Sequence, residues 1–281
     1  MGAKPADSGP QQPSLSRRQA TRRAFDSVAA AYDGPTGNNA LIQRMRHQLW
    51  STVEETFPRG ARLLDLGCGT GLDAVHFAQR GYQVHAIDSS SAMVARTQAR
   101  ARQQGLDGAV TAMALDMHEL ACLAGKRFDG IYSDLGAMNC VLDLPAVARS
   151  CAALLGPQGR LVASVIGRWC PWEIAYYALR GQFRRALLRA TREAAPVGLQ
   201  REVVWTRYLT PGEFYRAFAA DFALARYRSL CLFLPPPYLI GLCRRLPWLE
   251  TLLGRLDDRL GTLPLARDLG DHFLMVLARH G

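Results

Sequence analysis

Residues Leu63 to Gly71 read Leu-Leu-Asp-Leu-Gly-Cys-Gly-Thr-Gly, and this stretch decides the fold of the chain. An apolar run that contains one acid, Asp65, leads into three glycines spaced two apart. The pattern predicts a buried strand that ends in a tight turn, because glycine lacks a Cβ and tolerates positive φ. The helix expected over residues 72–80 would point its N-terminal N–H groups at any ligand bound beside this turn. We therefore expect a turn whose backbone closely approaches a bound ligand.

The segment resembles the first motif of the class I methyltransferases that use S-adenosylmethionine (SAM). By this resemblance, the cofactor-binding residues here are Asp65, Gly67, Cys68, Gly69 and Gly71. A dinucleotide-binding fold is the alternative, because the sequence from Gly69 onward also fits the pattern G-x-G-x-x-A. An NAD-dependent oxidoreductase on the same fold and a non-catalytic SAM-binding partner subunit therefore stay open at this point.

Two further acids follow expected strands. Asp88 lies 17 residues beyond Gly71, where a carboxylate can accept both ribose hydroxyls of an adenosine ligand. In the SAM family, an acid after the third strand contacts the adenine and an apolar neighbour packs on the ring, and Asp116 and Met117 match these residues. The resemblance adds three more cofactor-binding residues, which are Ser89, Met93 and Ser133.

The expected elements alternate between strand and helix. They are strands near 61–66, 82–88, 110–115, 128–133 and 159–166, with helices near 72–80, 90–104 and 145–155. This order predicts an α/β fold with a doubly wound, mostly parallel sheet and helices on both faces. The resemblance implies seven strands, with a closing helix near 211–220 and strands near 223–230 and 272–278. Ligands of such sheets bind at the carboxyl ends of the strands.

The expected core leaves three segments outside it. We expect a disordered basic tail at 1–24, a Rossmann-like SAM-binding core at 25–166, a cap insertion at 167–207, core again at 208–230, a second cap at 231–269 and the last core strand at 270–281. Both insertions are expected to be mainly helical and to emerge near the ligand edge, as a lid or substrate cap would.

Candidate catalytic residues lie on both sides of the glycine turn. The segment around Tyr32 resembles the helix that precedes the core in ubiquinone- and menaquinone-type methyltransferases, which implies that Tyr32 covers SAM or faces the methyl group. The loop after the fourth strand predicts that Asn139 orients a substrate oxygen, and His118 is a candidate general base. The candidate substrate-binding residues are Asn39, Met138, Trp172 and Tyr176.

The two insertions suggest different partners. In the first, aromatic residues at 172, 176 and 183 share one helical face, and arginines at 180, 184 and 185 crowd toward another. This pattern is typical either of a solvated arginine face or of a helix that contacts an anionic membrane or an acidic carrier protein. In the second, leucines spaced by three and four residues from 239 to 260 indicate cap packing, a homodimer seam or lipid contact.

Composition narrows the protein class. The 281 residues carry a net charge of +10, but no nucleic-acid-binding signature is present, so we expect no nucleic-acid partner. The seven cysteines include no C-x-x-C pair, which predicts neither a metal site nor a disulfide framework and favours the cytoplasm. No apolar run is long enough to span a bilayer, which leaves peripheral membrane attachment open.

Together these patterns predict a SAM-dependent methyltransferase for small molecules. The methyl group would move by direct in-line displacement to an O, C or N atom, because the sulfonium needs mainly positioning. Aromatic and aliphatic cap residues favour a fairly hydrophobic acceptor: a quinone, polyketide, isoprenoid or acyl-type product.

Overall fold

A seven-stranded sheet forms the centre of the computed structural model, which describes residues 12–241 and 247–281. Its strand order is β3-β2-β1-β4-β5-β9-β8. Strands β1 to β5 run parallel, and β9 pairs antiparallel with both β5 and β8. The strands of this sheet are β1 (Arg62–Leu66), β2 (Gln83–Asp88), β3 (Val110–Ala114), β4 (Phe128–Ser133), β5 (Leu155–Ile166), β8 (Phe222–Leu230) and β9 (His272–Arg279). The expected mostly parallel seven-stranded fold is confirmed.

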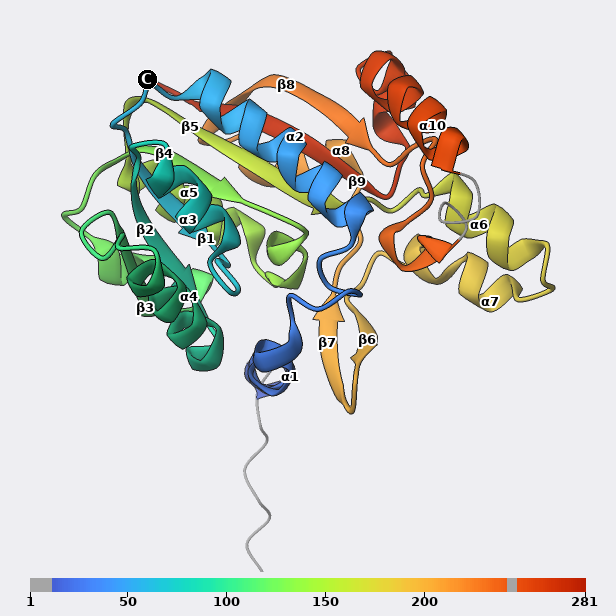
Figure 1. The fold of residues 1–281 in the computed structure, drawn as a ribbon, viewed down its shortest axis with the longest axis horizontal. Helices are drawn as coiled ribbons and strands as arrows, with labels where there is room; N and C mark the ends of the chain where they lie inside the picture. The colour runs from blue at the N-terminus through green and yellow to red at the C-terminus, as the bar shows by residue number, and fades with distance from the viewer. Residues whose placement is uncertain (1–11, 242–246) are drawn as a thin grey trace, which may run out of the picture.

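Helices cover both faces of the sheet (Figure 1). Residues of α2 (Ala40–Thr56), α3 (Leu72–Gln79) and α4 (Ser91–Gln103) share one apolar core with the sheet. Residues of α5 (Leu144–Leu154), α8 (Pro211–Phe218) and the 3-10 helix η2 (Met117–Leu123) form the other core, on the opposite face. The boundaries of the helices and strands from residue 61 to 166 lie close to the predicted ones, because strand-to-turn signals and apolar periodicity mark them locally.

Side-chain caps begin several of these helices. Asn39 caps α2 by accepting hydrogen bonds from the N–H groups of Leu41 and Ile42. Ser90 caps α4, and Thr210 forms a capping box with Glu213 at the start of α8. These polar groups satisfy helix N–H donors that would otherwise lack a partner.

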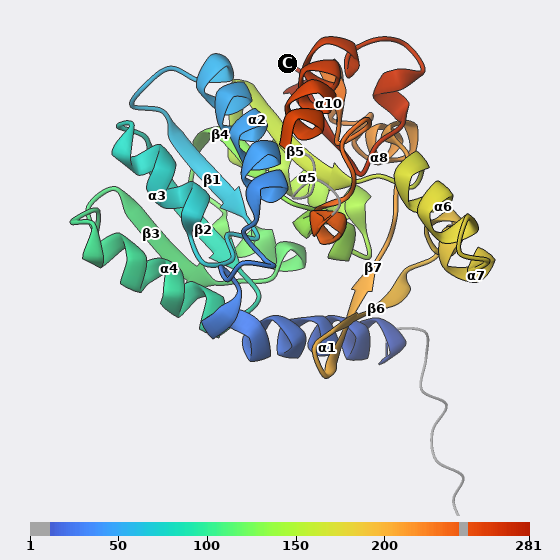
Figure 2. The same cartoon turned by 45° about the vertical axis from the view of Figure 1, so that its right-hand side comes forward.

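A helix and a hairpin lie beside the carboxyl ends of the parallel strands. The helix is α1 (Gln12–Val28), and the hairpin joins β6 (Ala195–Leu199) to β7 (Glu202–Thr206). Figure 2 shows α1 lying across the hairpin. The guanidinium of Arg17 lies 4.3 Å from the centre of the Trp205 ring, and the Thr21 hydroxyl accepts the Trp205 N–H at 3.1 Å. Helix and hairpin therefore form one packed unit.

This helix corrects the predicted disordered tail. Residues 12–24 are helical, and residues 1–11 lie outside the described part of the chain. The polar composition concealed the helix, because only a few residues such as Ala24 and Val28 are buried. Contacts with the distant hairpin, rather than a local pattern, stabilise α1.

The two insertions contain the remaining elements. Residues 167–207 form α6 (Pro171–Ala178), α7 (Phe183–Ala186), the 3-10 helix η4 (Leu188–Ala190) and the β6–β7 hairpin, which the sequence pattern does not reveal. Residues 231–269 include η5 (Pro237–Leu239), α10 (Pro247–Leu260) and η6 (Ala266–Asp268). Part of the predicted leucine stripe, at 242 and 246, lies outside the described residues. Two further 3-10 helices are η1 (Ala29–Ala31) and η3 (Ala137–Cys140). Over residues 12–241 and 247–281, no helix has the length and apolar character needed to cross a bilayer.

A buried ion cluster fastens the first insertion to the sheet. Arg189 donates from Nη2 to Glu173 of α6 and to Asp271, immediately before β9, at 2.7 Å in each case. The same guanidinium donates from Nη1 to the main-chain oxygens of Gly167 and Asp271 at 3.2 Å. A buried guanidinium with several partners joins segments that are far apart in sequence.

Replacing this arginine should destabilise the fold. We expect Arg189→Ala to lower the free energy of unfolding by about 3–5 kcal/mol, because two buried carboxylates lose their shared cation. Arg192→Ala, at an exposed position three residues later, is the matched control and should change it by less than about 0.5 kcal/mol. Chemical denaturation measures both values, and equal effects of the two substitutions would contradict the structural role of Arg189.

Candidate active site

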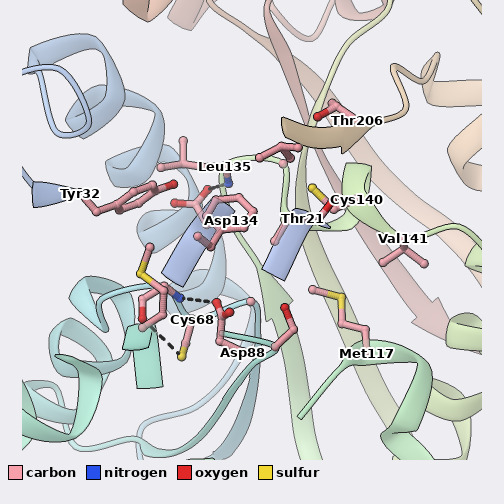
Figure 3. Close-up of a pocket in the computed structure, with 18 of the residues that line it drawn as sticks. Thr21, Tyr32, Cys68, Asp88, Met117, Asp134, Leu135, Cys140, Val141 and Thr206 are labelled. Carbon is pink, nitrogen blue, oxygen red and sulfur yellow. Dashed lines mark hydrogen bonds between the residues drawn. The ribbon is translucent and has the colours of Figure 1, made fainter. Parts of the chain in front are cut away.

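A cavity of about 290 Å³ opens at the carboxyl ends of the parallel strands. Its floor comes from the glycine turn and the ends of β2, β3 and β4, and its roof comes from α1 and the β6–β7 hairpin. Figure 3 shows Tyr32, Asp88, Asp134 and Cys140 around this cavity. Ten of the predicted site residues line it: Tyr32, Gly67, Cys68, Gly69, Asp88, Ser89, Met93, Asp116, Met117 and His118.

The glycine turn supplies an open backbone surface to the cavity. Gly67 has φ 81°, and a Cβ there would lie 2.5 Å from the Cβ of Ala137. Gly69 has φ 53°, and the nearest atom to a Cβ built on it is Cε1 of Tyr32, at 4.0 Å. Only glycine combines these φ values with such close approach. A Cβ at Gly69 would just contact the Tyr32 ring, so the turn and this ring lie close together where both line the cavity.

The end of β2 holds the turn in place. The Ile87 carbonyl accepts hydrogen bonds from the N–H groups of Gly67 and Cys68 at 2.8 and 2.9 Å. Asp88 accepts from the N–H of Gly69 at 3.0 Å through Oδ2 and from the N–H of Ser90 at 2.8 Å through Oδ1. Burial raises the pKa of Asp88, while these two N–H donors oppose the rise. Each carboxylate oxygen keeps a lone pair that can accept from a ligand hydroxyl.

Asp116 and His118 form a pair at another side of the cavity. Nδ1 of His118 lies 2.7 Å from Oδ1 of Asp116, and Arg18 of α1 donates to Oδ2 from Nε at 3.0 Å. Burial alone would raise the pKa of Asp116, but its bonds with His118 and the charge of Arg18 lower it to about 2. Asp116 is therefore ionised at neutral pH and joins α1 to the sheet edge.

A buried arginine faces two carboxyl groups near the turn. Arg46 of α2 lies 2.5 Å from Asp73 and 3.7 Å from Asp134, measured from Nη1 to Oδ2. Burial opposes its charge, yet Asp73 and Asp134 raise the pKa of Arg46. Burial and the charge of Asp73 raise the pKa of Asp134 to about 6. Arg46 Nε, Asp134 Oδ2 and Asp65 Oδ2 are buried without a hydrogen-bond partner. Arg46 and Asp134 both line the cavity, so a polar ligand can satisfy them.

The side of the cavity under the hairpin is mainly apolar. Its lining includes Val141, Ile166, Val197 and Val204. Cys140 hydrogen-bonds Thr206 here, and burial raises the pKa of the Cys140 thiol to about 12. Burial likewise raises the pKa of the Tyr32 hydroxyl to about 12. Both groups keep their protons at neutral pH.

Two asparagines predicted to lie in the site instead form hydrogen bonds with main-chain groups away from the cavity. The Nδ2 group of Asn139 donates to the main-chain oxygens of Ile166 and Arg207 at 3.0 and 2.7 Å, and its Oδ1 accepts the N–H of Ile166 at 2.8 Å. Asn39 caps α2 and donates to the Pro237 oxygen at 3.1 Å. Neither lines the cavity, because backbone groups take up both amides.

Three predicted substrate residues also lie away from the cavity. Met138 is fully buried in the apolar core. Trp172 donates from Nε1 to the Phe233 oxygen, and Tyr176 stacks under Arg180 at 3.7 Å from its ring centre. The first insertion contributes to the cavity through its hairpin instead of through α6.

The other predicted cofactor residues support the floor without lining it. Asp65 is buried beneath the turn, and Ser133 donates to the Leu66 oxygen at 2.8 Å. Gly71 has φ 81°, and a Cβ there would approach Thr97 to 2.7 Å. These residues shape the turn from below.

Several residues that line the cavity were not predicted as site residues. Sequence features of two of them, Arg46 and Asp134, could have indicated a functional role. Arg46 sits on the apolar face of α2 among Leu41, Met45 and Leu49, where a charge calls for an explanation. Asp134 directly follows β4, as Asp88 ends β2. Arg18, Thr21, Val197, Val204 and Thr206 carried no such signal, because they reach the cavity only through the packing of α1 on the hairpin. Within residues 12–241 and 247–281, no group of three or more acidic, histidine or cysteine side chains could hold a metal.

These features fit SAM. The adenosine part requires a hydroxyl acceptor such as Asp88, and the methionine part carries both a carboxylate and an ammonium group. Arg46 and Asp134 offer partners of opposite charge for those two groups. Gly69 and the Tyr32 ring line the same cavity as these polar groups.

Comparison with known proteins identifies the family. A family model described as a methyltransferase domain matches residues 63–159. The ubiquinone biosynthesis O-methyltransferase of Alkalilimnicola ehrlichii is 31% identical over 209 residues, which cover 73% of this chain and 79% of that protein. The protein of the same name from Rhodopseudomonas palustris is 27% identical, with 76% of this chain and 82% of that protein covered.

A solved structure shows the same fold. The Burkholderia thailandensis 1,6-didemethyltoxoflavin-N1-methyltransferase, with bound 1,6-didemethyltoxoflavin and S-adenosylhomocysteine, has a TM-score of 0.57 and 18% identity. The match covers 99% of this chain and 94% of that one. The nicotinamide alternative gains no support from these relatives, and the chain belongs to the class I SAM-dependent methyltransferases, with SAM as its cofactor.

Proposed function

We propose that this small-molecule methyltransferase transfers the methyl group to a hydroxyl oxygen of a small, fairly hydrophobic acceptor. The observation that carries the proposal is the apolar side of the cavity, where Val141, Ile166, Val197 and Val204 come together from separate segments. The relatives named O-methyltransferase favour oxygen as the acceptor atom. An apolar pocket with a few polar groups is typical of a site that orients such a molecule.

The cofactor supplies an activated methyl group on a sulfonium. We propose that the chain contributes positioning, which can lower the barrier substantially when the reacting atoms are aligned. Asp88 would hold the ribose hydroxyls, Arg46 the carboxylate and Asp134 the ammonium group of SAM. The roof of α1 and hairpin would exclude water from the acceptor.

Tyr32 and Cys140 would act with their protons in place. Because burial raises both pKa values to about 12, the Tyr32 hydroxyl can donate a hydrogen bond and the Cys140 thiol does not compete as a nucleophile. We propose that His118 positions Asp116 through its Nδ1 contact, since that pairing places the imidazole beside the predicted adenine contact. This assigns His118 a supporting role in place of general base.

An acceptor screen tests the proposal. Transfer of labelled methyl from SAM should occur to hydrophobic molecules with a free hydroxyl and fall at least about tenfold for matched amines or for the same molecules with the hydroxyl removed. Preferential methylation of the amines would contradict the choice of oxygen.

A pair of substitutions on β7 tests where the acceptor binds. Val204→Phe should raise the acceptor KM about tenfold or more and leave SAM affinity unchanged, because Val204 lines the apolar side of the cavity. Val203→Phe is the matched control, since Val203 is exposed on the same strand and does not line the cavity. Equal effects of the two substitutions on acceptor KM would contradict the assignment.

The role of Asp134 predicts a pH dependence of SAM binding. If ionised Asp134 holds the ammonium group, affinity stays constant above about pH 6 and falls by up to about tenfold per unit below it. Asp134→Asn should bind SAM more weakly at pH 8 and lose this dependence, whereas Asp107→Asn, at an exposed position, should behave as the wild type. Calorimetric titration from pH 5 to 8 measures both.

The predicted loss of SAM affinity below about pH 6 should not be caused by unfolding of the protein. The raised pKa of Asp134 means that the folded state binds its proton more readily than the unfolded chain does, so this group's contribution to stability increases as pH falls from about 6 toward its ordinary value. An unchanged pH dependence in Asp134→Asn would contradict the assignment.

A further inference from the structure

The helical hairpin of the first insertion carries an unusual surface that the active site does not use. Its outer end, residues 179–192, is here called the 179–192 tip. Leu179 is 87% exposed, Phe183 64%, Leu187 58% and Leu188 44%. Large apolar side chains rarely gather in contact with water without a partner, so this cluster calls for an occupant.

The same tip is strongly basic. Arg180, Arg184, Arg185 and Arg192 are all exposed, and residues 179–192 include no acid. Arg180 lies over the Tyr176 ring, at 3.7 Å from its centre, and Arg185 lies 5.9 Å from the centre of the Tyr177 ring. Arg189 points inward to Glu173 and Asp271 and is not part of the exposed set. The exposed apolar and basic groups therefore alternate along one short segment.

The tip is accessible from outside. Figures 1 and 2 show α6 and α7 extending away from the central sheet, at the right-hand side of both views. The buried Arg189 cluster at its base fixes its position relative to β9. A projecting, fixed and amphipathic end can approach a flat surface without rearrangement of the core.

We propose that the 179–192 tip docks the enzyme on an anionic lipid bilayer. Leu179, Phe183 and Leu187 would enter the boundary between headgroups and acyl chains, while the arginines would contact the phosphates. Charge complementarity favours this occupant, because a cluster of arginines without acids attracts an anionic surface. Contact between the tips of two copies would instead bring the four exposed arginines of each tip together, with Glu193 as the one adjacent acid.

Docking through the tip would also affect how the acceptor reaches the cavity. The tip includes η4 and ends shortly before β6, and residues of the β6–β7 hairpin line the cavity. Docking would hold this part of the roof close to the bilayer, where hydrophobic acceptors partition. The docking itself does not depend on which acceptor is methylated.

Vesicle flotation with the full chain tests the proposal. The wild type should bind vesicles of phosphatidylcholine with about 30% phosphatidylglycerol at least about tenfold better than pure phosphatidylcholine, and the preference should shrink at high salt. Leu179→Ser/Phe183→Ser/Leu187→Ser and, separately, Arg180→Gln/Arg184→Gln/Arg185→Gln should each reduce binding about tenfold or more.

Matched controls separate the tip from general effects. Leu263→Ser/Leu265→Ser removes exposed leucines elsewhere, and Arg96→Gln/Arg102→Gln/Arg216→Gln lowers the net charge equally at other exposed arginines. Both controls should bind like the wild type. All variants should keep wild-type SAM affinity without vesicles, so failure of docking is distinguishable from failure of the proposed function.

Three results would overturn the proposal. They are vesicle binding by the tip variants equal to that of the wild type, no preference for anionic over neutral vesicles, and equal losses in the control variants. Binding of a purified acidic carrier protein through the tip, or self-association through it, without binding to anionic vesicles would also reject the lipid surface in favour of that partner.

Discussion

The architecture of the site depends on the junction between the glycine turn and the end of β2. Three consecutive N–H groups of the turn, from Gly67 to Gly69, donate to the Ile87 carbonyl and the Asp88 carboxylate. These bonds require the positive φ values that glycine adopts without strain at 67 and 69. One short stretch thus fixes both the backbone that approaches the cofactor and the carboxylate that faces it.

The roof is held in place by interactions of a different kind. It consists of α1 and the β6–β7 hairpin, which pack on one another through Arg17, Thr21 and Trp205. Arg18 connects the roof to Asp116 on the floor through an ion pair at 3.0 Å. The floor is held by backbone hydrogen bonds between neighbouring strands and turns, whereas the roof is held by side-chain contacts between distant segments, including the apolar cluster of Val28 and Met93.

The floor of the site could be predicted from the sequence, whereas the roof could not. The parallel strands, their helices and the acid Asp88 are marked by local periodicity and by turn chemistry, so the sequence was sufficient to find them. The hairpin and α1 are stabilised by contacts across nearly 200 residues, such as Thr21 with Trp205, and no local pattern indicates them. Asn39 and Asn139 looked like substrate groups, but buried backbone donors and acceptors engage their amides. Arg46 is the opposite case, because it lines the cavity but was not predicted. A buried charged residue on the apolar face of a helix is itself an indication of a functional site.

The central claim is that the cavity between this floor and this roof holds SAM. A crystal structure of the chain with S-adenosylhomocysteine tests it most directly. The account predicts ribose hydroxyls within hydrogen-bonding distance of Asp88, the adenine beside Asp116 and Met117, and the amino-acid carboxylate at Arg46. A ligand bound outside the cavity, or one bound inside it with its ribose away from Asp88, would contradict the account.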